Sequence, residues 1–212
     1  MSSSLGPSRG PIICFEGCDK VGKTTLANKL KVRLEQDGLS VNFHCFPDRQ
    51  HALGIILNSY LKRQSEFSDE QVHQLFNTER RSVMQRYHKK SPATVILDRY
   101  VYSGCAYSVA KGKISLDWCV SQETDLPKPD LIFYVKGDLS KIIQRKDFGE
   151  DRFDKINFQK KVSSIYDQLF EKEVNVCTLD TGLKEMHEIE AEMFKCYYNK
   201  FQGQLLGPYT YY

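Results

Sequence analysis

The chain has 212 residues, a length that fits one domain with a core of ordinary size and makes a second full domain unexpected. Hydrophobic residues make up 41% of the sequence and charged residues 27%, close to the averages for soluble globular proteins, so disordered and fibrous classes are excluded. The formal net charge of +3 is too small for a protein that lives on a nucleic-acid backbone, and we expect no nucleic-acid partner.

The start of the chain and its cysteines indicate the cellular compartment in which the protein is found. Residues 1–10 contain Ser, Gly and Pro but no apolar run of signal-peptide length, so we expect a disordered tail followed by a single domain over 11–212. No stretch is long and apolar enough to cross a bilayer, and we expect no membrane contact. The seven cysteines include no CxxC pair and are odd in number, which suggests neither a disulfide framework nor a zinc site. Together these features predict a cytoplasmic protein.

The first elements of the chain predict a strand, a loop and a helix. Residues 11–16 (PIICFE) form an apolar run bounded by Pro and Gly, typical of a strand buried on both faces. Apolar residues recur at helical spacing from 23 to 37, and Gly38 follows as a helix stop. A second strand is expected over 39–46, where Pro47 ends it.

Two helices and a third strand come next. Residues 53–61 and 69–87 have helical spacing. Ser68 can cap the second of these helices, because Gln71 stands at the capping-box position. Residues 94–97 (TVIL) are few, β-branched and apolar, which predicts another buried strand.

The second half of the chain continues to alternate strand and helix. Strands are expected over 131–135 and 175–179, and helices over 139–145, 158–170 and 183–198. The alternation predicts an α/β fold of three layers, in which a parallel sheet of about five strands is flanked by helices. The polar, glycine-containing run 146–154 (KDFGEDRFD) interrupts this pattern and is expected to be a small mobile lid.

Residues 17–24 (GCDKVGKT) match the phosphate-binding pattern G-x-x-x-x-G-K-[ST] and lie between a predicted strand and a predicted helix, as a P-loop requires. Glycine allows backbone amides to point inward around phosphate oxygens. Lys23 would place a positive charge on the β- and γ-phosphates, and Thr24 would offer its hydroxyl to Mg²⁺. The residues expected to contact ATP are Gly17, Cys18, Asp19, Lys20, Val21, Gly22, Lys23, Thr24 and Thr25.

A carboxylate follows the third predicted strand. Asp98 would stand at the carboxyl edge of the sheet, where an acid of the Walker B type reaches the metal shell beside the P-loop. We therefore expect Thr24 and Asp98 to hold Mg²⁺, the aspartate through a water molecule. Arg99 comes directly after this aspartate.

Five motifs in sequence order carry a family resemblance. They are FEGCDKVGKTT at 15–25, FPDR at 46–49, LFNTER at 75–80, DRYVYSGCAY at 98–107 and LPKPD at 126–130. Together they resemble the successive signatures of eukaryotic-type thymidylate kinases, which are P-loop nucleoside monophosphate kinases. The resemblance spans most of the chain. It implies Mg²⁺-dependent transfer of the γ-phosphate of ATP to thymidine monophosphate (dTMP), giving dTDP for dTTP biosynthesis.

The resemblance implies how the acceptor is held. Phe46 and Arg49 belong to FPDR, whose arginine holds the acceptor phosphate in the family, a task that suits a guanidinium fork. Phe76 and Arg80 are four residues apart, hence on one face of the expected helix. The family uses the matching residues to stack on thymine and to bond its carbonyl edge. An amphipathic helix would also bury Phe76 simply as core.

Other acceptor contacts follow from the same resemblance. Arg99 matches an arginine that contacts the acceptor phosphate near the transfer point and would act there as a catalytic charge. Tyr107, in the same motif as Gly104, matches a position that lines the nucleoside pocket, and Asp19 matches an acid that contacts the deoxyribose 3′-hydroxyl. Phe153 departs from the family, which commonly has Tyr near the sugar, so any exclusion of a 2′-hydroxyl there would be steric.

Cations in and beside the lid complete the expected catalytic set. Lys20 stands where many eukaryotic members have Arg, so the charge is kept but the bidentate fork is lost. One of Arg145, Lys146 and Arg152 would close over the transferred phosphoryl group and stabilise the transition state. Which of the three does so stays open.

The resemblance also implies a homodimer formed through helices, and rival functions have to be weighed against it. Another nucleoside monophosphate or deoxynucleoside kinase would share the P-loop and lid, but would not predict LFNTER together with DRYVYSG. A regulatory GTPase would need an N-K-x-D stretch, which the sequence lacks. A catalytically dead nucleotide-binding scaffold is opposed by the intact Lys23, Thr24, Asp98 and Arg99.

Overall fold

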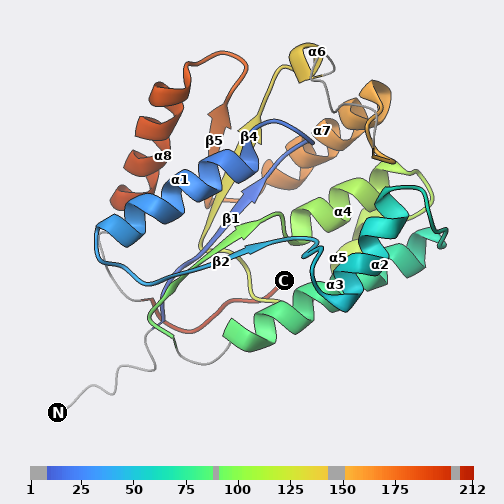
Figure 1. The fold of residues 1–212 in the computed structure, drawn as a ribbon, viewed down its shortest axis with the longest axis horizontal. Helices are drawn as coiled ribbons and strands as arrows, with labels where there is room; N and C mark the ends of the chain where they lie inside the picture. The colour runs from blue at the N-terminus through green and yellow to red at the C-terminus, as the bar shows by residue number, and fades with distance from the viewer. Residues whose placement is uncertain (1–8, 88–90, 143–150, 202–205) are drawn as a thin grey trace.

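The computed structural model describes residues 9–87, 91–142, 151–201 and 206–212. A parallel sheet lies at its centre, with the strands in the order β2-β3-β1-β4-β5 (Figure 1). The strands are β1 (Ile12–Glu16), β2 (Val41–Cys45), β3 (Thr94–Asp98), β4 (Leu131–Lys136) and β5 (Val176–Asp180). Each of them overlaps a strand expected from the sequence, and the neighbours are all parallel.

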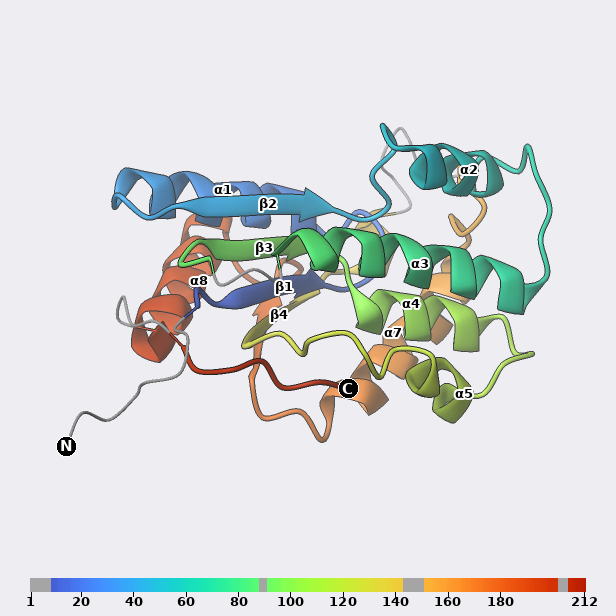
Figure 2. The same ribbon diagram turned by 90° about the horizontal axis from the view of Figure 1, so that it is seen from below.

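Helices cover both faces of this sheet, which confirms the three-layer α/β fold (Figure 2). One face carries α1 (Lys23–Gln36) and α8 (Met186–Phe201), and the other carries α3 (Asp69–Tyr87), α4 (Val101–Ala110), α5 (Leu116–Ser121) and α7 (Ile156–Phe170). The remaining helices are α2 (Ala52–Leu61) and α6 (Leu139–Ile142). Among the described residues, no helix has the length and apolar character needed to cross a membrane.

The central strands are mostly apolar because both of their faces are covered, and their carboxyl-terminal residues are the acids Glu16 and Asp98. Every residue of β1 and of β3 is buried. Ile13 and Phe15 of β1 belong to the same core cluster as the inner side chains of α1, whereas Ile12 and Cys14 cluster with side chains of α3 and α4. Successive residues of the strand thus serve opposite layers, as the two-residue period of a strand requires.

Local signals mark the helix ends that the sequence predicted. The Ser68 hydroxyl accepts from the Gln71 amide at 3.2 Å, and the Gln71 side chain accepts from the Ser68 amide at 2.9 Å, which confirms the capping box of α3. Gly38 has φ 81°, and the Leu39 amide donates to the Leu34 carbonyl at 3.0 Å, so α1 ends in the left-handed turn expected of glycine.

Helix α4 is an element that sequence periodicity did not predict. Its sequence, VYSGCAYSVA, combines β-branched and aromatic residues with a central glycine, which are weak helix formers. Tertiary packing overrides this propensity. Cys105 and Ala106 are buried against the rest of the core, and the helix lies against α7 and α3.

Two residues of the tail expected over 1–10, Arg9 and Gly10, are packed against the rest of the chain. Arg9 is 5% exposed, donates to Asp130 Oδ1 at 2.9 Å and stacks 4.1 Å from the centre of the Tyr209 ring. Its amide also donates to the Leu206 carbonyl at 3.0 Å. Gly10 is buried as well. An arginine in a Ser/Gly/Pro-rich segment carries no local signal, because its partners come from distant parts of the chain.

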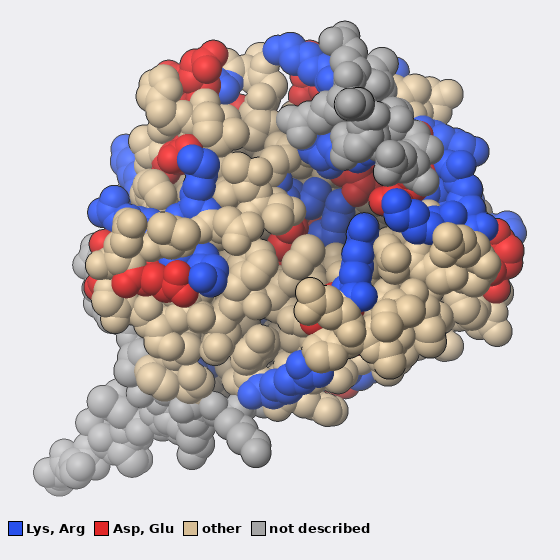
Figure 3. All heavy atoms as spheres, viewed as in Figure 1, with Lys and Arg blue, Asp and Glu red and all other residues tan. Residues whose placement is uncertain are grey.

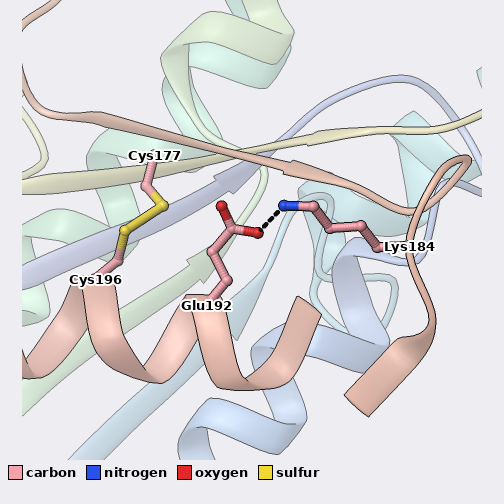
Figure 4. The surroundings of a disulfide bond; sticks show 4 residues. All are labelled: Cys177, Lys184, Glu192 and Cys196. Carbon is pink, nitrogen blue, oxygen red and sulfur yellow. Dashed lines mark hydrogen bonds and ion pairs between the residues drawn. A yellow bond between two sulfur atoms is a disulfide. The ribbon is translucent and has the colours of Figure 1, made fainter. Parts of the chain in front are cut away.

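A second correction concerns the cysteines. Cys177 of β5 and Cys196 of α8 form a disulfide, so the expectation of no disulfide is wrong for this pair (Figure 4). The cysteines meet because α8 packs against β5, a neighbourhood that spacing alone does not reveal. In the same view the Lys184 ammonium lies 2.6 Å from a carboxylate oxygen of Glu192. The free cysteines in the described chain are Cys14, Cys18, Cys45, Cys105 and Cys119.

Candidate active site

A cavity of about 730 Å³ opens at the carboxyl ends of the central strands. Figure 3 shows Lys and Arg side chains beside a hollow in this face of the molecule. The cavity is lined by these residues predicted from the sequence: Asp19, Lys20, Gly22, Lys23, Thr24, Thr25, Phe46, Arg49, Phe76, Arg80, Asp98, Arg99, Gly104, Tyr107 and Phe153. The residues predicted for the site that do not line it are Gly17, Cys18, Val21 and Arg152. Arg145 lies outside the described residues.

The turn between β1 and α1 requires glycine at both ends. Gly17 has φ 142°, and a Cβ there would lie 2.2 Å from the Val135 carbonyl oxygen, so no other residue fits. Gly22, with φ 102°, precedes α1 and offers no side chain to cap the helix. The amides of the first helical turn are therefore left for an anion, which a helix N-terminus attracts.

Lys23 is the first residue of α1, and its side chain folds back onto the P-loop. Its side chain is buried, and its ammonium donates to the Cys18 carbonyl. Burial and the nearby Arg99 lower the pKa of Lys23 to about 8, because both disfavour the charged form. Burial also raises the pKa of the Cys18 thiol to about 11, so this residue fills space as an uncharged thiol.

Thr24 and Asp98 meet in the way a magnesium site requires. The Thr24 hydroxyl donates to Asp98 Oδ2, and the Cys45 thiol lies 3.6 Å from the same oxygen. The other carboxylate oxygen of Asp98 is buried and has no hydrogen-bond partner among the described residues. An oxygen set with one unused carboxylate oxygen fits Mg²⁺, a hard cation that takes few protein ligands and completes its shell with phosphate and water.

Arg99 and Asp19 form an ion pair between the P-loop and the end of β3. Burial alone would raise the pKa of Asp19, but the cations Arg99 and Lys23 hold it below its ordinary value. The guanidinium also donates to the Gly17 carbonyl at 3.3 Å and lies 5.3 Å from the centre of the Tyr107 ring. The arrangement fixes the Arg99 guanidinium at the cavity wall beside the P-loop.

Phe76 and Arg80 line the far side of the cavity from α3, on one helical face as their spacing predicted. Arg80 is 2% exposed and donates from Nε to Glu123 Oε2 at 3.3 Å and from Nη2 to Oε1 of the same carboxylate. Gly104 leaves room for this guanidinium, since a Cβ there would lie 2.7 Å from Arg80 Nη2.

A buried histidine extends this ion pair. His73 Nε2 lies 3.3 Å from Glu123 Oε1, and His73 Nδ1 lies 2.9 Å from the Ser108 hydroxyl. Burial alone would raise the pKa of Glu123, but Arg80 first and His73 second hold it below its ordinary value. The ionised carboxylate of Glu123, which does not line the cavity, therefore holds the guanidinium of Arg80 in place.

The loop after β2 carries Phe46 and Arg49. Phe46 is buried beside the rings of His44 and Tyr100, whereas Arg49 is half exposed and its Nη2 lies 3.8 Å from Asp151 Oδ2. The loop is tied to α3, because the Asp48 amide donates to Glu79 Oε1 at 2.7 Å. Arg49 therefore reaches the mouth of the cavity from an anchored loop.

The sequence and structure comparisons agree with this geometry. A family model described as thymidylate kinase matches residues 15–193. The chain belongs to the thymidylate kinase family. It is 34% identical over 200 residues to a thymidylate kinase of Dictyostelium discoideum, covering 92% of this chain and 89% of that one. It is 35% identical over 167 residues to the thymidylate kinase of Homo sapiens, covering 78% and 79%.

The solved structure of thymidylate kinase from Candida albicans has the same fold. It superposes with a TM-score of 0.86 at 28% identity, covering 96% of this chain and 98% of that chain. Members of the thymidylate kinase family are nucleoside monophosphate kinases, so this chain is a phosphotransferase.

Arg152 and Phe153 were both expected at the site, and only one of them lines the cavity. Arg152 donates from Nε to the Tyr60 carbonyl at 2.9 Å and from Nη1 to Glu66 at 3.0 Å, so its guanidinium is bound to the α2 side and not to the cavity. Phe153 does line the cavity. Its ring stacks on Phe158 with centroids 5.0 Å apart and meets Tyr107 edge-on, so it belongs to an aromatic cluster.

Sequence reasoning missed several residues that organise this thymidylate kinase site. Gln159, 1% exposed on α7, donates to Asp19 Oδ2 at 2.7 Å and accepts from the Asp19 amide at 3.0 Å. Asp19 is thus held by Gln159 and Arg99. Glu123 precedes the LPKPD motif by a few residues, and that proximity was the one available signal. No sequence signal pointed to Gln159, because a polar residue in a helix is expected on the surface unless its buried partner is known.

Proposed function

We propose that the chain catalyses ATP + dTMP = ADP + dTDP, a step of dTTP biosynthesis. The observation that carries the proposal is a single cavity whose lining runs from Lys23 and Thr24 of the P-loop, past Arg99, to Phe76 and Arg80. Donor and acceptor groups then share one space, as direct transfer between two bound nucleotides requires.

On the donor side, the amides of the P-loop and the Lys23 ammonium would bind the β- and γ-phosphates of ATP. Thr24 and Asp98 would hold Mg²⁺, which when bound neutralises charge on the phosphates. Lys20 would add a positive charge to the donor phosphates. Its ammonium lies 3.1 Å from Asp154, so that charge is tied to the last residue of the expected lid.

At the transfer point, Lys23 and Arg99 would neutralise the charge that develops on the migrating phosphoryl group. No general base is required, because the attacking phosphate oxygen is already ionised at neutral pH. The expected lid over 146–154 would exclude water during transfer. Because Arg152 is bound to Tyr60 and Glu66, it would have to leave these partners to act as the lid cation.

On the acceptor side, the Phe76 ring would stack on thymine and Arg80 would donate to its carbonyl edge. Arg49 would hold the phosphate of dTMP, and Asp19 the 3′-hydroxyl of the sugar. The remaining residues proposed to shape the nucleoside pocket are Phe46, Gly104, Tyr107 and Phe153. Since Glu123 neutralises Arg80, the base end of the cavity carries directed N–H donors and little net charge.

A panel of acceptors tests this function against its nearest rivals. ADP release should be measured with dTMP, UMP, CMP and thymidine at saturating ATP and Mg²⁺. We expect kcat/KM for dTMP to exceed that for CMP by about 100-fold or more, since the amino group of cytosine replaces a carbonyl and leaves a buried donor unpaired. UMP keeps the carbonyl edge but lacks the methyl group and adds a 2′-hydroxyl, so shape should disfavour it by about 10–200-fold. A preference for UMP or CMP would contradict the proposal, and turnover of thymidine in place of dTMP would indicate a nucleoside kinase.

We also propose that the chain forms a homodimer in the cytoplasm. Ile55 and Ile56 of α2 are 57% and 41% exposed, and apolar side chains on a helix surface are suited to contact a second copy. Sedimentation velocity should give twice the mass of the chain, and Ile55→Glu should shift it toward the monomer. A wild-type chain that sediments as a monomer would contradict the proposal.

A further inference from the structure

Glu16, the last residue of β1, is a buried carboxylate outside the set assigned above. Its exposure is 0%, and a buried charge is costly unless hydrogen bonds satisfy it. At Oε1 it accepts from the amides of Tyr100 at 2.8 Å and Ser103 at 3.1 Å. At Oε2 it accepts from the phenol of Tyr166 at 2.9 Å and from the hydroxyl of Ser103. The carboxylate is therefore bound mainly to the start of α4.

The two amides bonded by Glu16 are the ones that a helix needs to have capped. Tyr100 is the residue that precedes α4 and has no side-chain cap of its own, and Ser103 is the third residue of that helix. In a capping box these two amides are satisfied by side chains of the same helix. Here one carboxylate from the neighbouring strand satisfies both, so β1 fixes where α4 begins.

The start of α4 in turn fixes Arg99. This residue has φ 69°, a left-handed conformation that is costly for a long side chain and persists only where the surroundings hold it. Its amide donates to the Phe15 carbonyl at 2.9 Å, and the capped Tyr100 follows it directly. The backbone of Arg99 is thus held between β1 and a helix start that Glu16 determines.

The side chain of Arg99 is linked to the same carboxylate through Ser103. Arg99 Nη1 donates to the Ser103 hydroxyl oxygen at 3.2 Å. The hydroxyl donates its single proton to Glu16 and also lies 2.7 Å from the Tyr166 phenol oxygen, and it keeps a lone pair that accepts from the guanidinium. The amides of Tyr100 and Ser103 and the hydroxyl of Ser103 all donate to Glu16, and this arrangement orients the Ser103 hydroxyl.

We propose that Glu16 is a positioning residue for Arg99, acting by capping α4 from β1 and by orienting the Ser103 hydroxyl toward the guanidinium. The proposal rests on the proposed function, since it concerns how Arg99 is aimed at the transferred phosphoryl group. Glu16 does not line the cavity, so its effect on turnover would pass through Arg99.

Glu16→Gln tests this mechanism with little change of shape. The amide oxygen of Gln can still cap Tyr100 and Ser103, but its NH₂ group would donate to the Ser103 hydroxyl and compete with Arg99. We expect kcat with dTMP to fall about tenfold, the size of one good hydrogen bond, while KM for ATP stays constant. Thermal unfolding of the variant checks that the fold is retained.

A double-mutant cycle with Arg99→Ala separates positioning from general structural damage. ADP release is measured for the wild type, E16Q, R99A and the double variant. If Glu16 acts through Arg99, E16Q should change kcat less than about twofold once Arg99 is absent. Equal losses in both backgrounds, or no loss in the wild-type background, would overturn the proposal. A wild-type chain that fails to phosphorylate dTMP would instead contradict the proposed function.

Two further variants keep the test decisive if E16Q unfolds. Ser103→Ala removes the hydroxyl link but keeps the capped amide, so it should lower kcat several-fold and show the same non-additivity with R99A. Tyr166→Phe removes a donor from the same Glu16 oxygen and a neighbour of the Ser103 hydroxyl, but no hydrogen bond to Arg99. Because Ser103 keeps its bond to Glu16, this variant should keep kcat within about twofold of wild type. Additive losses for S103A and R99A, or a Y166F loss as large as that of S103A, would overturn the proposal.

Discussion

Arg80 and Glu123 form an ion pair whose side chains are 2% and 0% exposed. Burying two charges is costly, so such a pair adds little net stability, but removing one partner leaves the other charged in a site without water. The pair holds the guanidinium plane of Arg80 at the cavity wall, with Gly104 leaving the space it needs. Under the proposed function, Glu123 would therefore support base recognition through Arg80, although it does not line the cavity.

Replacing Glu123 by Ala should be among the most damaging single substitutions. The free energy of unfolding should fall by about 3–5 kcal/mol, because Arg80 would remain buried and unpaired. Urea denaturation measures this change. The matched control is Asp125→Asn, which breaks the exposed ion pair between Asp125 and Arg81, the neighbour of Arg80 on α3. This change should lower the free energy of unfolding by less than about 1 kcal/mol. Similar losses for the two variants would contradict the role of burial.

Gly104→Ala should weaken dTMP binding selectively. The new Cβ would lie 2.7 Å from Arg80 Nη2, and the guanidinium, held by Glu123, would have to shift. We expect KM for dTMP to rise about tenfold while KM for ATP stays within about twofold, the pattern of a lost acceptor contact. Steady-state kinetics with each substrate varied in turn checks this. An unchanged KM for dTMP would show that Arg80 does not need this space.

Lys23→Ala should lower kcat by about a thousandfold, as expected when a charge aimed at the transferred phosphoryl group is removed. More than about a tenth of the wild-type rate at saturating ATP and Mg²⁺ would contradict the assigned role.

The pH dependence of kcat/KM for ATP should also reveal the ionisation of Lys23. Its pKa is lowered to about 8, so in the free enzyme the ammonium becomes neutral as the pH rises through that value. Because neutral lysine binds phosphate poorly, kcat/KM for ATP should decrease above about pH 8. The alkaline decrease should be absent in K23A, whose low residual activity is measured at high enzyme concentration. A wild-type profile that is flat up to pH 10 would contradict the prediction.

The disulfide between Cys177 and Cys196 should stabilise the β5–α8 unit. It closes a loop with a sequence separation of 19, for which chain-entropy estimates give about 3 kcal/mol. We expect Cys177→Ser to lower the unfolding temperature under non-reducing conditions and to have little effect under reducing ones. The control is Cys45→Ser, which removes an exposed free thiol. Peptide mapping without reductant should recover the linked pair, and two free thiols there would contradict the bond.

Sequence alone determined the strands, most helices and the phosphate-binding loop. Each of these features follows from a pattern of residues that are close together in the sequence. Apolar runs form buried strands, the Ser68 and Gln71 pair caps α3, and glycine at 17 and 22 permits the turn around phosphate. The spacing of Phe76 and Arg80 likewise placed both on one face of a helix.

The tertiary structure alone decided which buried groups face one another. Glu16 meets α4, Glu123 meets Arg80 and Gln159 meets Asp19 across sequence separations of 87, 43 and 140 residues. Helix α4 forms against its own propensity because its start is capped from β1 and its apolar side is buried. The Cys177–Cys196 bond and the anchoring of Arg9 have the same cause. Charge pairing and capping between distant segments depend on the fold, since no local pattern encodes the partner.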